Sequence, residues 1–285
     1  MNIFFRLNLL FQSFLNIVLC FIYIPKRGII ENAKKPKNNT SDITIFGNGP
    51  SLNADVQSFE LFSDNVMVVN SFVNSTFFKK IRPNYYIITD PGFFLKTEDK
   101  RILNIQKQLI SAISKDLSWE IQFIVPKKFY NSDTVIFLRK NKYVNVITYK
   151  DKPTIGGFDW INNHLYKFNF ANPHYQNVLI ASIFLSMKLR FKKIIIYGAD
   201  HSWHEDLYLS DNNILFRNDK HFNSNLTSRP LQIKLKNKPM DVSRQFDDLS
   251  RVFRTYHQIQ NYASKNGVEI INKSSKTWID AFKRD

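Results

Sequence analysis

The chain has a single cysteine, Cys20, among its 285 residues, and this scarcity excludes several classes of protein. No intrachain disulfide, cysteine zinc cluster or thiol pair can form. A disulfide-stapled secreted scaffold is therefore excluded, and the composition fits a reducing compartment. The chain also lacks a G-K-[ST] sequence after a glycine-rich turn, which excludes a P-loop. We find no internal repeat and no long low-complexity tract.

What is present is ordinary globular composition with a strong basic bias. Hydrophobic residues make up 44% of the chain and charged residues 22%, and 285 residues can bury a sizeable core. The 40 Lys and Arg exceed the 24 Asp and Glu, giving a formal charge of +16. Such a charge attracts nucleic acid, an anionic membrane or a phosphorylated substrate. No nucleic-acid-binding module is recognisable and the basic residues are scattered, so we do not expect a nucleic-acid partner.

The N-terminal segment reads as a membrane-associated helix. Residues 3–24 are apolar except for a few positions, and Asn2, Arg6, Ser13 and Asn16 fall on one narrow helical stripe. The stretch is long enough to span a bilayer, but a polar stripe suits a helix that lies in the interface. The basic segment that follows prefers anionic headgroups on the cytoplasmic side.

We therefore expect residues 1–40 to be a hydrophobic anchor and basic linker at the cytoplasmic face of the inner membrane. Whether the helix spans the membrane or lies on it stays open. The alternative is a buried N-terminal helix of the globular domain. A signal peptide is disfavoured because no small-residue cleavage site follows the apolar run.

Residues 41–285 predict a single α/β domain. Apolar runs alternate with helical patterns, which is typical of a Rossmann-like, mainly parallel sheet with helices on both faces. Strands are expected at 43–46, 66–69, 85–88, 121–125, 144–148, 193–197 and 268–271. Helices are expected at about 53–62, 97–114, 175–188, 241–264 and 277–282. A polar region at about 205–240 has weak periodicity and is expected to form a lid.

Four expected strands end in polar or glycine-rich turns, which are Gly47–Ser51, Asn70-Ser71, Asp90-Pro91-Gly92 and the segment from Asp200. Ligands of open parallel sheets bind at these carboxyl ends. In the first turn, Gly47 and Gly49 permit close approach of a ligand, and Ser51 is a candidate cap of the next helix. The turn is not a G-x-G-x-x-G fingerprint, because Leu52 occupies the third glycine position.

Histidines provide the candidate bases. His201 and His204 follow an apolar strand, and His221 lies in the expected lid. Imidazole titrates near neutral pH and can take a proton from an acceptor hydroxyl. Asp200, His201, His204 and Asp206 offer metal ligands as an alternative, but no H-E-x-x-H pattern is present and we do not expect a metal.

The string Ile45–Leu52 (IFGNGPSL), together with Asn70 and Asp90-Pro91-Gly92, resembles the bacterial sialyltransferases of glycosyltransferase family 42. It also resembles the broader DUF115 or MptE-like group found in surface-glycan gene clusters. Residues 189–200 look like the second strand motif of these families. The resemblance covers roughly residues 43–92 and 173–208.

The resemblance implies a binding site for a nucleotide sugar, expected to be CMP-linked, with no other cofactor. Asn48 and Asn70 match asparagines that meet the donor, and Asp90 stands where the family has an asparagine. Two family tyrosines that hold the donor phosphate fall on Ser202 and Tyr208. The catalytic histidine is missing near residues 240–243, so His201, His204 or His221 would replace it. The complete candidate set is Gly47, Asn48, Gly49, Ser51, Asn70, Ser71, Asn177, Asp200, Ser202 and Tyr208 for the donor, and His201, His204, His221 and Asp90 for catalysis.

The sequence thus predicts a metal-independent glycosyltransferase that moves a sugar to a hydroxyl of a cell-surface glycan. The chain has no D-x-D sequence, the metal-chelating pair of many glycosyltransferases. Expected partners are a nucleotide sugar, a glycan or lipid-linked glycan and an anionic membrane surface, and an oligomer is possible. One alternative is an MptE-like 6-hydroxymethylpterin diphosphokinase. Such an enzyme uses ATP and magnesium, and the carboxylates of Asp90 and Asp200 would suit it. Another is a non-catalytic glycan-binding relative.

Overall fold

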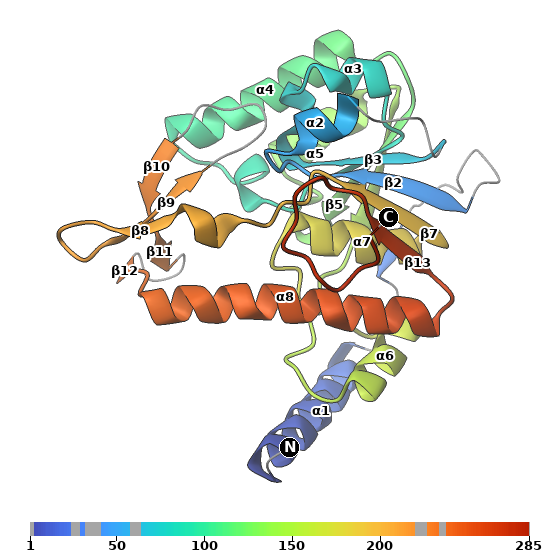
Figure 1. Ribbon diagram of the computed structural model, residues 1–285. Coiled ribbons are helices and arrows are strands. Elements are labelled where there is room, and N and C mark those ends of the chain that lie inside the picture. The colour runs from blue at the N-terminus through green and yellow to red at the C-terminus, as the bar shows by residue number, and fades with distance from the viewer. Residues whose placement is uncertain are drawn as a thin grey trace.

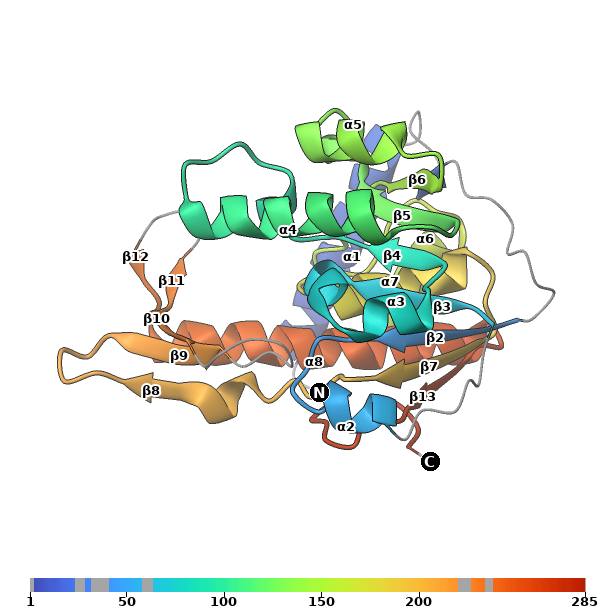
Figure 2. The same ribbon diagram turned by 90° about the horizontal axis from the view of Figure 1, so that it is seen from above.

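The computed structural model describes residues 3–23, 29–31, 41–57, 64–219, 227–233 and 238–284. Its centre is an eight-stranded sheet in the order β1-β6-β5-β4-β3-β2-β7-β13. The pairs from β6 to β13 are parallel, and β1 is antiparallel to β6. The strands are β1 (Ile30–Glu31), β2 (Asp42–Phe46), β3 (Val66–Val69), β4 (Tyr85–Ile87), β5 (Ile121–Pro126), β6 (Val144–Tyr149), β7 (Lys193–Tyr197) and β13 (Glu269–Asn272). Figure 2 shows β6, β5, β4, β3, β2, β7 and β13 side by side in the order of the sheet.

Helices cover both faces of the sheet, as Figure 1 shows. One face carries α2 (Leu52–Gln57), α3 (Phe77–Ile81), α4 (Lys100–Asp116) and α5 (Asp133–Lys140), and the other carries α6 (Asp159–Lys167), α7 (Val178–Lys188) and α8 (Val242–Lys265). Successive strand residues alternate between two cores: Ile43 and Ile45 pack with α7 and α8, whereas Phe46 packs with α2. Strands buried on both faces explain the unbroken apolar runs in the sequence. The predicted Rossmann-like α/β fold is confirmed.

The parallel part of the sheet starts in the middle, at β2, and builds outward in both directions. From β2 the chain adds β3 to β6 on one side, then returns through α7 to place β7 and β13 on the other side of β2. Strand order therefore reverses between β2 and β7. Such a switch point brings two loops from different halves of the fold together at the carboxyl edge of the sheet, where ligands of this architecture bind.

The polar region expected as a lid forms antiparallel strands instead of an irregular loop. A three-stranded sheet joins β8 (Leu207–Leu209), β9 (Leu215–Asp219) and β10 (Thr227–Pro230), and a two-stranded one joins β11 (Gln232–Ile233) and β12 (Lys238–Pro239). Leu215 is buried and Phe216 stacks on Tyr208, so a few apolar side chains suffice to support this sheet. His221 lies outside the described residues.

The C-terminal segment expected as a helix at 277–282 has no regular secondary structure, so that expectation was wrong. Its polar groups bond to the ends of two strands: Thr277 Oγ1 donates to Ala199 O at 2.6 Å, and Trp278 N donates to Asp200 O at 2.9 Å. Ile279 and Phe282 are buried against the main core. Their spacing of three residues imitates a helix, but long-range hydrogen bonds decide the conformation.

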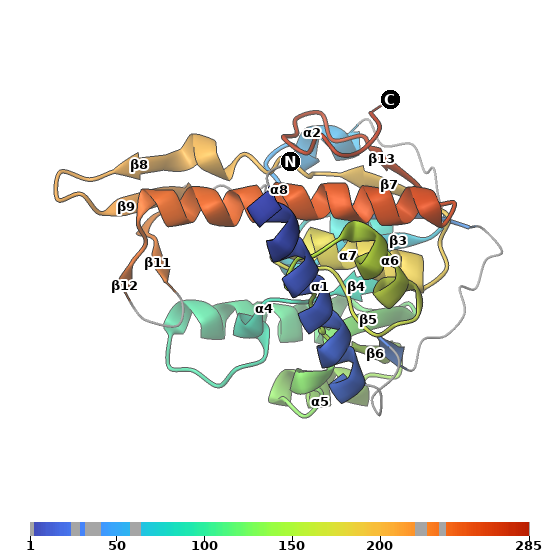
Figure 3. The ribbon, with the colours of Figure 1, turned by 90° about the horizontal axis from the view of Figure 1, so that it is seen from below.

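The apolar N-terminal segment forms α1 (Ile3–Tyr23), which lies on the outside of α6 and runs across the underside of the molecule in Figure 3. Its polar stripe is divided: Arg6 is exposed, whereas Ser13 and Asn16 are buried against residues 155–158. Most of the large apolar side chains of α1 are exposed. Part of the basic linker, residues 24–28 and 32–40, falls outside the described residues.

Candidate functional site

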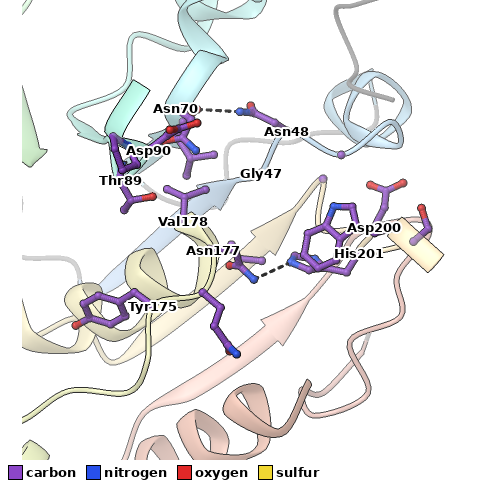
Figure 4. A pocket seen from close by; sticks show the side chains of 18 of the residues that line it. Gly47, Asn48, Asn70, Thr89, Asp90, Tyr175, Asn177, Val178, Asp200 and His201 are labelled. Carbon is purple, nitrogen blue, oxygen red and sulfur yellow. Dashed lines mark hydrogen bonds between the residues drawn. The ribbon is translucent and has the colours of Figure 1, made fainter. Parts of the chain in front are cut away.

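A cleft of about 450 Å³ lies at the carboxyl edge of the sheet, where the switch point was expected to place a ligand. It collects the ends of β2, β3, β4 and β7 and the N-terminal end of α7. Figure 4 shows Asn48, Asn70 and Asp90 to one side of it and Asn177 and His201 to the other. Of the predicted site residues, those that line the cleft are Gly47, Asn48, Gly49, Asn70, Asp90, Asn177, Asp200, His201 and Ser202. The structure therefore brings residues from all four polar strand ends to one cleft.

The glycines of the first turn make room for a neighbouring strand end. Gly47 N donates to Tyr197 O at 2.8 Å and Gly49 N to Gly198 O at 2.9 Å, so the loops after β2 and β7 are in direct contact. A Cβ atom on Gly49 would lie 1.9 Å from the Asp200 carboxylate, and one on Gly47 would lie 2.3 Å from Gly198 O. These glycines are required by the protein's own backbone.

Hydrogen bonds between Ser51 and Asp200 stabilise the contact between the loops after β2 and β7. Ser51 Oγ donates to Asp200 Oδ2 at 2.7 Å, and Ser51 N donates to Asp200 Oδ1 at 3.1 Å. Asp200 is 3% exposed, and this burial raises the pKa of its carboxyl while the Ser51 hydrogen bonds oppose the rise. Ser51 directly precedes α2, and its carbonyl accepts from Ala54 N and Asp55 N, but Ser51 does not line the cleft. Asp55 completes the cluster by accepting from Gly198 N at 2.8 Å.

Two asparagines hold the next strand ends. Asn70 has a φ of 42°, a left-handed conformation that asparagine tolerates, and its Oδ1 accepts from Thr89 N at 3.2 Å. Asn48 Nδ2 donates to Val69 O at 3.1 Å. This bond orients the Asn48 amide, and its Oδ1 is buried with no hydrogen-bond partner among the described residues. A buried polar atom of this kind costs stability until something pairs with it.

Tyr175 adds a second buried group of this kind to the cleft wall. Its hydroxyl has no hydrogen-bond partner among the described residues. Burial, together with nearby Tyr149 and Asp151, raises the pKa of this phenol well above its ordinary value, so the phenol stays neutral. A neutral hydroxyl can both donate and accept a hydrogen bond. The cleft thus offers a buried acceptor and a buried hydroxyl to a polar ligand.

His201 lines the cleft but its imidazole is engaged by the protein. Nε2 lies 2.8 Å from the Tyr256 hydroxyl and 3.5 Å from Asn177 Nδ2, and the ring packs edge-on against Trp203. Burial lowers the pKa of His201 from 6.5 to about 4, because imidazolium is disfavoured in this apolar surrounding. The ring is neutral at pH 7 and is a weak base.

Several candidates lie outside the cleft. His204 lies in the short 3-10 helix Trp203–Asp206, and its ring packs edge-on against Trp278 with 4.2 Å between the ring centres. His204 is not among the residues that line the cleft. The Tyr208 hydroxyl pairs with Ser228 Oγ at 2.6 Å on the antiparallel sheet. Ser71 is the second residue of a short 3-10 helix, Asn70–Asn74, and is not among the cleft-lining residues.

Other cleft residues escaped the sequence analysis. Tyr149 and Asp151 mark the end of β6, and Lys128 follows β5, so the rule used for the other strand ends applies to them equally. Arg217 and Asn218 reach the cleft from β9, which long-range pairing alone reveals. Four carboxylates and two cations line the cleft, namely Asp90, Asp151, Asp200, Asp206, Lys128 and Arg217.

No group of three or more His, Cys, Asp or Glu side chains suited to a metal ion occurs within the described part of the chain. His201 and His204, proposed above as alternative ligands, face different aromatic neighbours, Trp203 and Trp278.

Comparison with known proteins gives a family and a fold. A family described as 6-hydroxymethylpterin diphosphokinase MptE-like matches residues 21–206. No curated protein matches the chain. Among solved structures, the MAf glycosyltransferase from Magnetospirillum magneticum AMB-1 is similar with a TM-score of 0.50 and 10% identity, over 91% of this chain and 36% of that one. This chain thus spans about a third of that protein's length.

A second solved structure is the monofunctional alpha-2,3-sialyltransferase Cst-I from Campylobacter jejuni. It is similar with a TM-score of 0.39 and 14% identity, over 85% of this chain and 78% of that one.

Proposed function

The chain belongs to the MptE-like family, and from that premise we propose that it is a glycosyltransferase using a nucleotide-sugar donor. It would transfer the sugar to a hydroxyl of a cell-surface glycan or lipid-linked glycan. The fold shared with a protein named as a glycosyltransferase supports this proposal. The cleft chemistry described above supports it independently.

The observation that carries the proposal is the buried Oδ1 of Asn48, which has no hydrogen-bond partner among the described residues and belongs to a cleft lined by four asparagines. Amides are neutral and recognise the N–H and O–H groups of a base, ribose or sugar without requiring charge. A buried acceptor strongly discriminates ligands that pair with it from those that do not. The N-terminal end of α7 and the cations Lys128 and Arg217 would face the donor phosphate.

We assign the general base to Asp90 in preference to His201. Asp90 is exposed at the cleft rim, and its Oδ1 accepts from Gly92 N at 2.9 Å. The other oxygen, Oδ2, has no protein partner within the described residues and is available to an acceptor hydroxyl. His201 would instead position Asn177 and Tyr256, since its Nε2 is within hydrogen-bond distance of both.

A second candidate is the diphosphokinase activity in the family's name. The excess of carboxylates over cations in the cleft favours it, because carboxylates suit the magnesium ion of a magnesium–ATP complex. Asp90 and Asp151 would be its metal-facing groups. The two functions require different nucleotides, so a binding experiment separates them.

The deciding experiment is a thermal-shift panel on the full chain with CMP-sugars, UDP-sugars, ATP with magnesium, and magnesium alone, each with and without EDTA. We expect a CMP- or UDP-sugar to raise the melting temperature and EDTA to leave the shift unchanged. Protection by ATP with magnesium alone would favour the diphosphokinase. Sugar transfer from the protecting donor to a membrane lipid extract would then identify the acceptor class and distinguish an enzyme from a non-catalytic binder.

A matched pair of variants links the panel to the cleft. Asn48→Ala removes the buried acceptor and is expected to weaken donor affinity by about tenfold or more, the usual cost of losing one buried hydrogen bond. Asn74→Ala removes an exposed asparagine outside the cleft and should leave affinity unchanged. Equal affinities for the two variants would remove Asn48 from the donor site.

A further inference from the structure

Helix α1 exposes most of its large apolar side chains, the reverse of what is usual for a surface helix of a soluble protein. Ten of its large apolar side chains are each at least 38% exposed, whereas its polar residues Ser13 and Asn16 are buried against the body. These outward residues are Ile3, Phe4, Phe5, Leu7, Leu10, Phe11, Phe14, Ile17, Val18 and Phe21. A surface helix normally turns its apolar face to the core. An exposed apolar surface of this extent marks an interaction site.

Side chains of α1 make specific hydrogen bonds to the body. Asn16 Nδ2 donates to Gly156 O at 2.8 Å, and Asn16 Oδ1 accepts from Ile155 N at 3.1 Å. Ser13 Oγ accepts from Phe158 N at 2.9 Å. These bonds satisfy the backbone of the loop at residues 155–158, so α1 is a structural part of the domain.

Two glycines of that loop let the helix approach. Gly156 and Gly157 have φ values of 120° and 93°. A Cβ atom on Gly157 would lie 2.6 Å from Ser13 Oγ, and one on Gly156 would lie 2.4 Å from Gln12 Oε1. A segment that is cleaved off, as a signal peptide is, would leave these bonding groups without partners. The contact therefore belongs to the working protein.

The position of the docking contact limits how deep α1 can go. The hydrogen bonds of α1 to residues 155–158 come from Gln12, Ser13 and Asn16, in the middle of the helix, and residues 3–11 lie N-terminal to them. Nine helical residues extend roughly 13 Å, against about 30 Å for a bilayer's hydrocarbon core. A docked α1 can enter one leaflet but cannot cross both. Trp160 and Ile155, 60% and 49% exposed, lie on the elements that hold the helix, and tryptophan favours the membrane interface.

We propose that α1 is an in-plane anchor that inserts its apolar side into one leaflet of an anionic bilayer while its buried polar residues stay fastened to residues 155–158. The basic residues that follow α1 in the sequence, Lys26, Arg27, Lys34, Lys35 and Lys37, supply charge complementary to anionic headgroups. This inference does not depend on the proposed function, because vesicle binding tests it without turnover.

The first test is flotation of the full chain with vesicles of phosphatidylglycerol and phosphatidylethanolamine, compared with phosphatidylcholine vesicles. We expect binding to the anionic vesicles, and at least about tenfold weaker binding for Phe11→Asp, which places a charge on the inserted face. Leu95→Asp, at an exposed apolar residue whose carbonyl bonds to α4, is the matched control and should bind as the parent does.

The second test uses an N-terminal epitope tag on vesicle-bound protein. An in-plane helix keeps the tag on the side of the domain, so added protease removes it without detergent. A tag protected until detergent is added would show that α1 crosses the bilayer, and would overturn the proposal. Failure to bind vesicles, with light scattering showing a dimer that Phe11→Asp dissociates, would assign the apolar side to a second copy of the chain and would also overturn it.

Discussion

The cleft and the α1 docking site both depend on a pair of glycines, but the cleft presents polar groups and α1 presents apolar ones. In each, a pair of glycines lets two segments approach closely: Gly47 and Gly49 for the β7 loop, Gly156 and Gly157 for α1. In the cleft, Asn48 Oδ1 and the Tyr175 hydroxyl stay buried without a hydrogen-bond partner among the described residues. At α1, the contact uses Ser13 and Asn16 and leaves ten large apolar side chains exposed. The side-chain groups that remain available at each site, and not the glycines, indicate what kind of partner the site binds.

Residues of the sequence motifs mostly stabilise the cleft, and few of them are left to bind a ligand. Gly49, Ser51 and Asp200 form the motif on which the resemblance rests, yet they bond to one another. Asn70 bonds to the end of β4. These residues hold the edge of the cleft in place, and the groups left for a ligand are fewer. We expect changes to the two kinds of residue to have different consequences.

The largest effect is expected for Asp90→Asn on turnover. The amide preserves the oxygen that accepts from Gly92 N but cannot act as a base, so kcat should fall by about 10² to 10⁴. The thermal shift given by the donor should be unchanged. Transfer rates with saturating donor provide the measurement. Unaltered kcat in Asp90→Asn, together with its loss in His201→Asn, would return the role of base to His201.

Gly49→Ala should cost the most folding stability of the single changes considered. The new methyl would overlap the buried Asp200 carboxylate and Gly198 O, and we expect a loss of about 3 kcal/mol in the free energy of unfolding. Gly92→Ala is the control, since the nearest atom to its Cβ is 3.3 Å away. Urea denaturation measures both. Similar midpoints would show that the β2 and β7 loops can separate at little cost.

His201 should make stability depend on pH. Burial lowers its pKa from 6.5 to about 4, so between these values the unfolded chain binds a proton that the folded chain does not. The stabilisation is complete above pH 6.5 and is lost as the pH falls toward 4, amounting to at most about 3 kcal/mol. His201→Asn should flatten this slope, whereas His174→Asn, at an exposed histidine, should not. Parallel slopes for parent and His201→Asn would contradict the burial of a neutral ring.

Gly157→Ala should have the smallest effect on the body and a local effect on α1. Its methyl would meet Ser13, so α1 loosens at a cost of about 1 to 2 kcal/mol. Cys20, the single thiol, is 8% exposed on the docked helix and reports the release. Maleimide labelling of Cys20 should accelerate by roughly tenfold, the factor that 1.4 kcal/mol corresponds to. Labelling at the parent rate would mean that the loop at residues 155–158 does not hold the helix.

The sequence alone determined the sheet and its edge. Unbroken apolar runs predicted the seven parallel strands, because strands buried on both faces need no polar alternation. The polar ends of β2, β3, β4 and β7 predicted the cleft, since the carboxyl ends of parallel strands share one edge. The hydrophobic run at residues 3–24 predicted α1. These features depend on local pattern or on a rule of topology.

Only the tertiary structure decided what each group contacts. The sequence could not show that Gly49 faces Asp200, that His201 is enclosed by Tyr256 and Trp203, or that Arg217 reaches the cleft from β9. Nor could it show that Ser13 and Asn16 of α1 face inward. Each of these depends on contacts between residues far apart in the chain, and hydrophobic period records which residues share a face but not which surface that face meets.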